Sequence, residues 1–379
     1  MRVVDLFAGC GGLSLGFEAE GYDVCLAVEL WDSARKVYQK NFNHPVVDID
    51  LSSVVDACNV ISPYNPDIII GGPPCQEFSM AGARVEGERA KLTFNFSEII
   101  CNLKPNWFLL ENVPGIKNSA TWKESRDLLK QHGYGITEVV LNAAFFGVPQ
   151  NRKRFFAIGH LNEEDNFIKE LVEKKKNDTP MTIREYADDR LEINFYYRHP
   201  RNWGRKGIFS VDEPAPTVRS TIRQVPPGYK AHPDDAGPLE EARALNTEEL
   251  ALIQTFPKDF VFLGTKTAQN TMIANAVPVE LSRHIAHCIL EYEYHLADKG
   301  NEEFKIWLEN SNNYTKRTAG NIISRLKRIS HIIPSNYFNR DYCDILNKLE
   351  MSSLFKSLTP SVKSQIKKAI QLKIAFLNR

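Results

Sequence analysis

Short apolar runs alternate with helix-like stretches along residues 1 to about 160, and this alternation constrains the fold more than any other feature of the chain. Stretches with helical character, including 13–20 and 31–41, lie between runs that are rich in β-branched side chains. The runs have the length of buried strands and lie at 2–7, 23–29, 67–70, 107–110 and 155–158. Such alternation predicts a parallel α/β sheet covered by helices, in which a ligand binds at the carboxyl ends of the strands.

The rest of the chain changes character twice. Residues 185–264 are rich in Pro, Gly and Arg with few helix signals, which predicts a small irregular β-rich region. Helical spacing returns at 269–294 and continues in the amphipathic stretches 318–333 and 362–377. We therefore expect three parts, namely 1–160 completed by 267–299, a small domain with a connector at 161–266, and a helical extension at 300–379.

Composition excludes several classes of protein. The hydrophobic content of 43% with 25% charged residues is ordinary for a globular chain with a substantial core. No apolar run approaches the roughly 18 residues that span a bilayer, and the strand-like start does not resemble a secretory leader, so we expect a cytoplasmic protein that does not contact membranes. The seven cysteines form no CxxC pair and the nine histidines no HExxH, which argues against disulfides and a metal site.

Charge is segregated along a chain whose net charge is zero. Residues 311–379 contain thirteen Lys or Arg and three Asp or Glu, a net of +10, so the remainder has a net of −10. A basic segment attached to a mildly acidic domain is typical of a protein that binds a polyanion through the basic segment. A solvated helical face is the alternative, and charge alone leaves both open.

A glycine-rich segment, Asp5-Leu6-Phe7-Ala8-Gly9-Cys10-Gly11-Gly12, follows the first strand and opens a helix. Glycine lets backbone amides approach a ligand closely at a helix N-terminus. Glu29 ends the next strand, where a carboxylate can bind a ribose diol. The combination indicates a nucleotide-type site, although a purely structural turn would need the same glycines.

The sharpest motif is Gly71-Gly72-Pro73-Pro74-Cys75-Gln76, where a strand runs into a rigid turn and then a thiol. Most free cysteines are inert core residues. Cys75 differs because the two prolines fix the backbone and a polar loop follows, which predicts a nucleophile at the rim of the sheet.

Two further groups carry charge at strand ends. Glu111 follows the buried run 107–110, and desolvation there would raise its pKa and suit it to hold a proton. Arg152 and Arg154 precede the strand at 155–158, and alternation places them on one side, where their donors could hold a carbonyl or a carboxylate. A turn-capping carboxylate and solvated arginines are the alternatives.

These pieces, in this order, resemble the cytosine-C5 DNA methyltransferases of bacterial restriction–modification systems. The likeness covers about 1–160 and 205–299. It extends to the segments Pro214-Ala215-Pro216-Thr217-Val218-Arg219, Leu252-Ile253-Gln254-Thr255-Phe256-Pro257 and Asn275-Ala276-Val277-Pro278. The resemblance implies a Rossmann-like sheet that binds S-adenosyl-L-methionine, a small β-rich recognition domain, and double-stranded DNA as the partner.

Site residues follow from the same resemblance. The catalytic residues would be Cys75, which attacks C6 of a flipped cytosine, Glu111, which stabilises the protonated N3, and Arg152 and Arg154, which hold the base and the carboxylate. The cofactor would be bound by Asp5, Phe7, Gly9, Gly11, Gly12, Glu29, Trp31, Asp48, Ile49, Pro73, Leu92, Asn275 and Val277. A monomer and a cognate restriction endonuclease acting on the same site are also expected.

DNA contacts are predicted from basic residues that lie near aromatic ones, since arginine serves both phosphate and guanine contacts. The candidates are Arg84, Arg198, Arg201, Arg205, Lys206 and Arg223. In the family, Arg219 occupies a position that organises the small domain. The basic helices after residue 300 are not part of the family pattern and would either add DNA contacts or form a folded appendage that docks a partner.

Two other functions would share part of this pattern. An RNA cytosine methyltransferase would share the catalytic motifs, but the Cys-Phe-Thr element of the tRNA-modifying branch is not found. A catalytically inactive DNA-binding protein would not need Cys75, Glu111, Arg152 and Arg154 together. A zinc deaminase is excluded because the chain has no Pro-Cys-x-x-Cys set.

Overall fold

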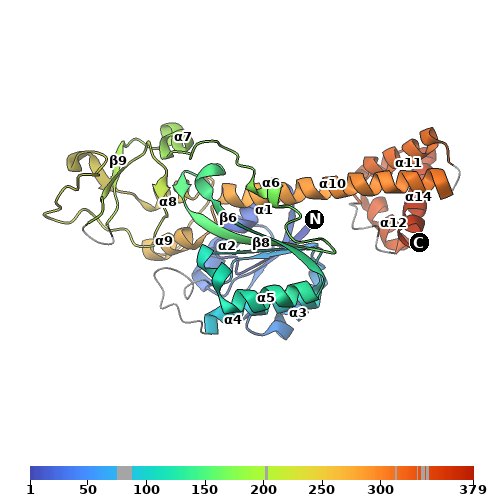
Figure 1. Ribbon diagram of the computed structural model, residues 1–379, viewed down its shortest axis with the longest axis horizontal. Coiled ribbons are helices and arrows are strands. Elements are labelled where there is room, and N and C mark those ends of the chain that lie inside the picture. The colour runs from blue at the N-terminus through green and yellow to red at the C-terminus, as the bar shows by residue number, and fades with distance from the viewer. Residues whose placement is uncertain (75–87, 201–203, 312–313, 331, 334–337, 339–340) are drawn as a thin grey trace. The chain divides into compact units, whose positions relative to one another are not determined.

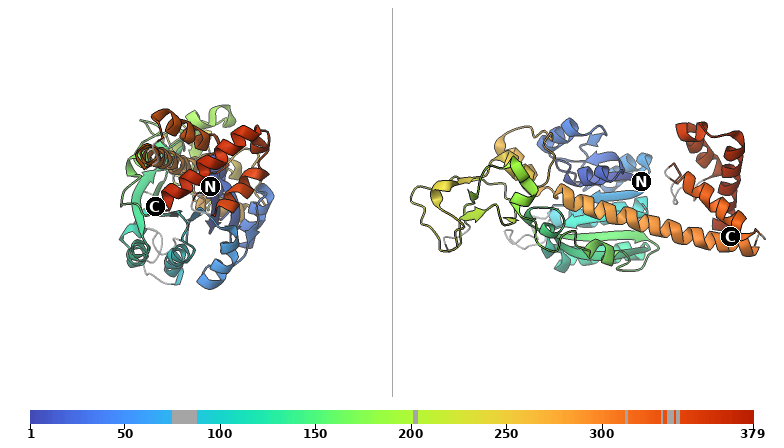
Figure 2. Two further views of the ribbon diagram at one scale, coloured as in Figure 1. Left: turned by 90° about the vertical axis from the view of Figure 1, so that its right-hand side faces the viewer. Right: turned by 90° about the horizontal axis from the view of Figure 1, so that it is seen from above.

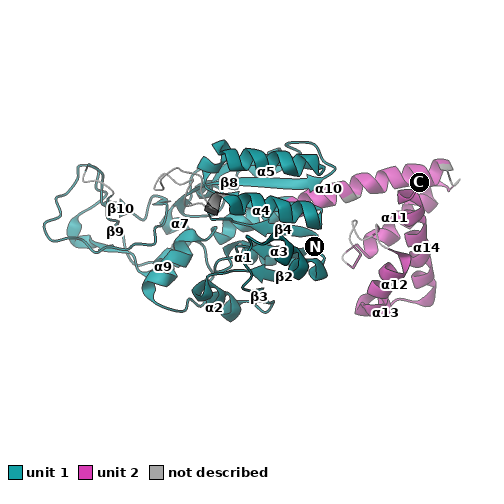
Figure 3. Ribbon diagram, turned by 90° about the horizontal axis from the view of Figure 1, so that it is seen from below, with its two compact units in different colours: residues 1–288 teal, residues 289–379 magenta. Residues whose placement is uncertain are grey.

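The computed structural model describes residues 1–74, 88–200, 204–311, 314–330, 332–333, 338 and 341–379. The chain forms two compact units, Met1–Cys288 and Ile289–Arg379, coloured separately in Figure 3. The division falls within the long helix α10 (Val279–Ser311). Among the described residues, no helix combines the length and the apolar character needed to cross a membrane.

A seven-stranded sheet with the order β3-β2-β1-β4-β5-β8-β6 forms the centre of the first unit. Its strands are β1 (Arg2–Leu6), β2 (Asp23–Val28), β3 (Val46–Val47), β4 (Ile68–Gly71), β5 (Trp107–Asn112), β6 (Tyr134–Asn142) and β8 (Lys153–Leu161). The strand order reverses between β1 and β4, and ligands of open α/β sheets bind at such a switch point. The expected α/β class with a large parallel sheet is confirmed.

One strand departs from the predicted parallel arrangement, because β8 pairs antiparallel with both β5 and β6. Only ten residues separate β6 from β8, and they hold the short 3-10 helix η3 (Ala143–Phe145) and strand β7 (Gln150–Asn151). A parallel crossover needs about a dozen residues or more, usually with a helix. The link is too short for that, so β8 must return in the opposite direction.

Helices cover both faces of this sheet (Figure 1, Figure 2). On one face α3 (Val54–Ile61), α4 (Glu88–Leu103) and α5 (Ala120–Gln131) bury a core that includes Phe96, Phe108 and Trp122. On the other face α1 (Gly12–Ala19) packs against the start of α10, and α2 (Asp32–Asn41) follows β2. Each large apolar side chain buried in this way contributes about 1.5–3 kcal/mol.

A smaller, irregular lobe follows the sheet in sequence. It contains the three-stranded sheet β10-β9-β12 and a two-stranded pairing of β11 with β7. Its elements are α6 (Lys169–Glu173), α7 (Ile183–Ala187), β9 (Phe195–Tyr197), β10 (Ile208–Ser210), β11 (Ala215–Pro216), β12 (Ala242–Ala244) and α8 (Thr247–Ile253). The strands have two or three residues each, which agrees with the irregular β-rich region predicted from composition.

The single helical segment predicted at 269–294 is two helices, α9 (Lys266–Asn275) and α10. Ala276 leaves the helical conformation with φ −59° and ψ 147°, and Pro278 follows two residues later. Proline lacks an amide hydrogen and disfavours a helical conformation in the residue before it. The break therefore leaves Asn275 as the last residue of α9 and places Ala276 and Val277 in an extended connection.

The second unit consists of the C-terminal part of α10 together with α11 (Lys316–Arg328), α12 (Tyr342–Met351), α13 (Ser353–Lys356) and α14 (Pro360–Leu377). Its core is apolar and receives side chains from all five helices, among them Phe304, Leu326, Ile345, Phe355 and Ile370. The predicted C-terminal helical extension is confirmed.

Candidate active site

The loop after β1 has a backbone that only small residues adopt easily. Gly9 and Gly11 have φ values of +57° and +98°, and Phe7 has +58° despite its side chain. A Cβ atom on Gly11 would lie 2.3 Å from the ring of Phe42, and one on Gly12 would lie 2.4 Å from the carbonyl oxygen of Val277. The glycines at 11 and 12 are thus required by close packing as well as by conformation.

Glu29 follows β2 beside this loop, and both of its carboxylate oxygens are held. One accepts a hydrogen bond from the Gly9 amide and the other from the Trp31 amide, each at 2.7 Å. Burial raises the pKa of Glu29, while these two amides and nearby Arg35 oppose the shift. The side chain of Trp31, next to this carboxylate, is 39% exposed. Its ring is therefore accessible for stacking on a ligand.

The other predicted cofactor residues lie along the same edge or close to it. Asp48 and Ile49 follow β3, and the Asp48 carboxylate lies 3.4 Å from the Arg35 guanidinium. Leu92 lies in the first turns of α4, which follows β4. Asn275 is exposed at the end of α9, and Val277 is buried in the connection between α9 and α10. The structure thus gathers residues from four sequence regions near the switch point of the sheet.

Asp5 lies beneath the loop in β1 and is fully buried. One of its oxygens accepts a 2.6 Å hydrogen bond from Ser14 Oγ, which also contacts Tyr38 Oη at 2.6 Å. His44 Nε2 lies 2.7 Å from Tyr38 Oη and continues the chain of polar contacts. Burial raises the pKa of Asp5 to about 7. The packing around Asp5 therefore favours its neutral form.

The Pro-Pro turn is attached to the end of β5. Asn112 Nδ2 donates to the carbonyl oxygen of Pro73 at 3.1 Å. A Cβ on Gly72 would lie 3.0 Å from the Glu111 carboxylate, so the turn passes close to this side chain and a larger residue would crowd it. Cys75, the predicted nucleophile, lies outside the described residues, and so does Arg84. The turn that leads to Cys75 is nevertheless held directly against Glu111.

Glu111 is buried at the carboxyl end of β5, with 8% of its surface exposed. Arg154 on β8 forms an ion pair with it, with 2.9 Å between Nε and a carboxylate oxygen. Burial raises the pKa of Glu111, and Arg154 and Arg152 counteract part of that rise. The outcome is a carboxyl group that keeps its proton to higher pH than usual, next to a fixed cation.

Arg152 differs from Arg154 in its surroundings. It is 1% exposed, and its Nη2 donates to the carbonyl oxygens of Ala274 at 2.8 Å and Ala276 at 3.0 Å. These contacts link Arg152, just before β8, to the end of α9 and to the connection that follows it.

A pair of buried glutamines was missed by sequence reasoning. Gln150 Nε2 donates to Gln254 Oε1 at 2.7 Å, and Gln150 Oε1 accepts from the Val218 amide at 2.8 Å. Gln254 Nε2 in turn donates to the carbonyl oxygens of Ile273 and Ala276. Gln254 lies in the segment 252–257 that resembles the family, and an amide side chain between apolar residues was the available signal. The pair connects segments that are far apart in sequence.

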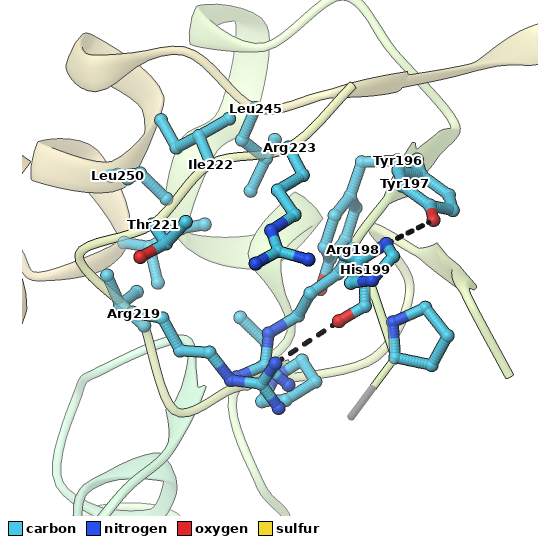
Figure 4. Close-up of a pocket in the computed structure, with 15 residues that line it drawn as sticks. Tyr196, Tyr197, Arg198, His199, Arg219, Thr221, Ile222, Arg223, Leu245 and Leu250 are labelled. Carbon is cyan, nitrogen blue, oxygen red and sulfur yellow. Dashed lines mark hydrogen bonds between the residues drawn. The ribbon is translucent and has the colours of Figure 1, made fainter. Parts of the chain in front are cut away.

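The small lobe contains a cavity of about 350 Å³ lined by arginines and tyrosines (Figure 4). Arg219 Nη1 donates to the His199 carbonyl oxygen at 3.1 Å, consistent with an organising role. Arg198 Nη2 donates to the carbonyl oxygen of Thr217. Arg223 is exposed and extends into the cavity between Arg219 and the two tyrosines, Tyr196 and Tyr197. The cavity therefore has a cationic centre and aromatic walls.

The other predicted DNA contacts are dispersed. Lys206 is held by the Glu213 carboxylate at 2.8 and 3.1 Å, which neutralises its charge locally. Arg205 lines a neighbouring cavity together with Arg198 and Arg219. Arg201 lies outside the described residues. Arg198 and Arg223 are thus brought together, whereas Lys206 is committed to a carboxylate.

Comparison with known proteins identifies relatives over most of the chain. The sequence model of the family described as C-5 cytosine-specific DNA methylase matches residues 1–291. Type II methyltransferase M.HindV of Haemophilus influenzae is 49% identical over 296 residues, which cover 77% of this chain and 97% of that protein. Type II methyltransferase M.HgiDI of Herpetosiphon aurantiacus is 44% identical over 293 residues, covering 77% and 95%.

Solved structures share the fold at lower identity. The Dnmt2 methyltransferase of S. pombe is 19% identical with a TM-score of 0.57, covering 77% of this chain and 99% of that chain. The Entamoeba histolytica methyltransferase EhMeth is 18% identical with a TM-score of 0.59, covering 77% and 98%. Residues 292–379 lie beyond the family match, so the helices α11 to α14 have no counterpart in it.

Proposed function

The chain belongs to the C-5 cytosine-specific DNA methylase family, and on that premise we propose that it transfers a methyl group from S-adenosyl-L-methionine to C5 of a cytosine in a specific double-stranded DNA sequence. The observation that carries the proposal is the buried Glu111–Arg154 ion pair at the end of β5, against which the Pro-Pro turn is packed. Both residues lie within the part of the chain that the family model matches, residues 1–291, which supports a role for the pair in methyl transfer.

The residues at the β1 and β2 ends fit the proposed cofactor. Glu29 is fixed by two amides beside an exposed Trp31 ring, a donor and acceptor set suited to a ribose and an adenine. The left-handed conformations of Phe7, Gly9 and Gly11 leave open space at Gly9, where a Cβ would meet nothing within 4 Å. The bound cofactor supplies an electrophilic methyl group on a sulfonium. The chain's contribution is to hold it at the edge where the Pro-Pro turn begins.

Cytosine C5 is a weak nucleophile, and the catalytic residues activate it. In the proposed reaction the Cys75 thiolate adds to C6 of a flipped cytosine while Glu111 delivers a proton to N3. After methylation at C5, a base removes the C5 proton, the thiolate leaves from C6, and N3 returns its proton to Glu111, which restores the aromatic ring and the catalytic acid. Arg154 holds the Glu111 carboxyl, and Arg152 fixes Arg154's strand to the cofactor connection. A buried acid with a raised pKa suits this proton donation.

The remaining parts receive roles within the same proposal. We assign catalysis to 1–160 completed by 267–299, and target recognition to 161–266, where Arg198 and Arg223 meet in the aromatic-walled cavity. The protein acts as a monomer and forms the modification half of a restriction–modification system with an endonuclease that cuts the same site. The two similar Type II methyltransferases motivate this assignment.

The test is expression in a host that lacks cytosine methylation, followed by sequencing of its genomic DNA with a method that resolves 5-methylcytosine. Full methylation of one short recurring sequence is expected, and Cys75→Ser should abolish it while the variant still binds DNA and cofactor. Methylated RNA with unmethylated DNA would overturn the assignment of substrate. Methylation by Cys75→Ser at the normal level would overturn the mechanism.

A further inference from the structure

The second unit divides its charge between two sets of helices. Its part of α10 carries six acidic side chains and two lysines, whereas α11 and α14 together carry nine Lys or Arg and no Asp or Glu. Surfaces that only need solvation normally mix both signs. Lys327 and Lys367 pair with Asp298 and Glu350, and Lys373 is buried, so the available positive charge comes from the remaining cations, which include Arg317 and Arg328.

Part of the charge pattern in α11 opposes helix stability, whereas the three cations in its last turn are favourably placed for the helix dipole. Lys316 and Arg317 occupy the first turn, where the helix dipole disfavours positive charge. Arg325 and Arg328 are three residues apart, so two like charges are neighbours on the helix surface. Each effect costs a few tenths of a kcal/mol to about 1 kcal/mol. A polyanionic partner would remove both penalties.

Four polar residues of α11 form a straight row on its exposed face, which we call the α11 strip. The strip consists of Arg317, Asn321, Ser324 and Arg328, all exposed. It lies opposite the buried side of the helix, because Ala319, Ile322, Ile323 and Leu326 are at most 8% exposed. Eleven residues of helix place the two strip arginines about 16 Å apart, a length over which duplex DNA presents about ten phosphate charges.

We propose that the α11 strip binds the phosphate backbone of double-stranded DNA. The choice of DNA rests on the proposed function, since the first unit belongs to a family that acts on it. Arginine, asparagine and serine are residue types that contact phosphates and groove edges. A membrane surface fits less well, because an interfacial helix needs an exposed apolar face and that of α11 is buried in the unit's core.

Two matched double variants of the full chain test the proposal. Arg317→Gln/Arg328→Gln removes two charges from the strip, and Lys299→Gln/Lys305→Gln removes two from the acidic α10 segment. Affinity for a short labelled DNA duplex is measured over a range of salt concentrations. We expect the strip variant to bind about tenfold more weakly, with a slope of log affinity against log salt reduced by about 1.8. The control variant should keep both values.

A third variant and two further binding measurements distinguish a loss of charge from other causes of weaker DNA binding. Arg317→Lys/Arg328→Lys keeps both charges and should keep the salt slope, which separates charge from damage to the fold. Equal affinity of the strip variant and the wild type for DNA would overturn the proposal. So would a loss confined to single-stranded RNA or to anionic vesicles. Methyl transfer by the wild type is assayed separately. A chain that binds DNA through the strip but transfers no methyl group would contradict the proposed function and leave the proposal about the strip intact.

Discussion

The arginines discussed in the two units differ in burial and in the partners of their side chains. Arg152 and Arg154 in the first unit are buried or nearly so, and each is fixed by named acceptors. Arg317 and Arg328 in the second unit are exposed on a face without any carboxylate of its own helix. A buried charge must be paired, because desolvation without a partner costs several kcal/mol. An exposed cation carries no such cost and remains available to a partner, so neutralising the two kinds should affect different measurements.

The strongest test of the comparison removes the acid at the buried site. Glu111→Gln keeps the shape of the side chain but cannot transfer a proton, so methylation should slow by about 10²–10⁴-fold. DNA and cofactor affinities should change little. Glu138→Gln is the control, because Glu138 on β6 also pairs with an arginine, Arg126 at 3.1 Å. Initial rates of methylation check the prediction, and a rate within threefold of the wild type would exclude Glu111 as the proton donor.

Removing the partner of that acid should have the next largest effect. Arg154→Gln is expected to slow methylation by about 10–100-fold, or about 1.4–2.7 kcal/mol. The Arg154 cation lowers the pKa of Glu111, so without it that pKa rises further above the ordinary value. The protonated form then persists to higher pH, and the alkaline limb of the pH–rate profile should move upward. An unmoved limb would mean that Glu111 does not control it.

Two glycine substitutions should change stability in opposite directions in the two units. Gly12→Ala places a Cβ 2.4 Å from the Val277 carbonyl oxygen, and overpacking of this kind costs about 1–3 kcal/mol. Gly320→Ala lies within α11 with nothing within 4 Å of its Cβ, and it should stabilise that helix by about 0.5–1 kcal/mol. Hydrogen exchange followed by mass spectrometry reports each unit separately. Stabilisation by both substitutions would show that the α1 packing is looser than described.

The smallest expected effect concerns a cation of α11 that already has a partner. Lys327 lies 2.7 Å from the Asp298 carboxylate, and both side chains are more than half exposed. Such pairs contribute about 0–1 kcal/mol. Lys327→Gln should therefore lower DNA affinity less than twofold, while Arg328→Gln alone lowers it more. Titrations of the two single variants decide this, and equal losses would mean that pairing does not matter on this helix.

Local pattern was sufficient to predict five of the seven strands of the central sheet, whereas β3 and β6 were missed. Glu111 and Glu29 were expected at strand ends and are found there. The predictable part depends on periodicity and on glycine and proline, whose effects act over a few residues. The cytosine methylase family was likewise identified from ordered motifs and is confirmed.

Features set by distant contacts were not predictable in the same way. The reversal of β8 and the break before α10 are exceptions, because the short link and Pro278 that explain them are both visible in the sequence. Gln150 and Gln254 are 104 residues apart, and no local signal pairs them. The neutralisation of Lys206 by Glu213 likewise becomes visible only when the side chains are placed.

The packing of α1 also has a consequence for the order in which the protein is made. Gly12 meets the backbone of Val277, and Ser282 Oγ donates to the Leu13 carbonyl oxygen at 2.8 Å. A ribosome adds about 5–20 residues each second, so roughly 15–50 s pass between synthesis of α1 and of its partners. During that interval the first helix emerges without the surface it packs on. The glycine-rich loop can therefore reach its final form only after nearly all of the first unit has been translated.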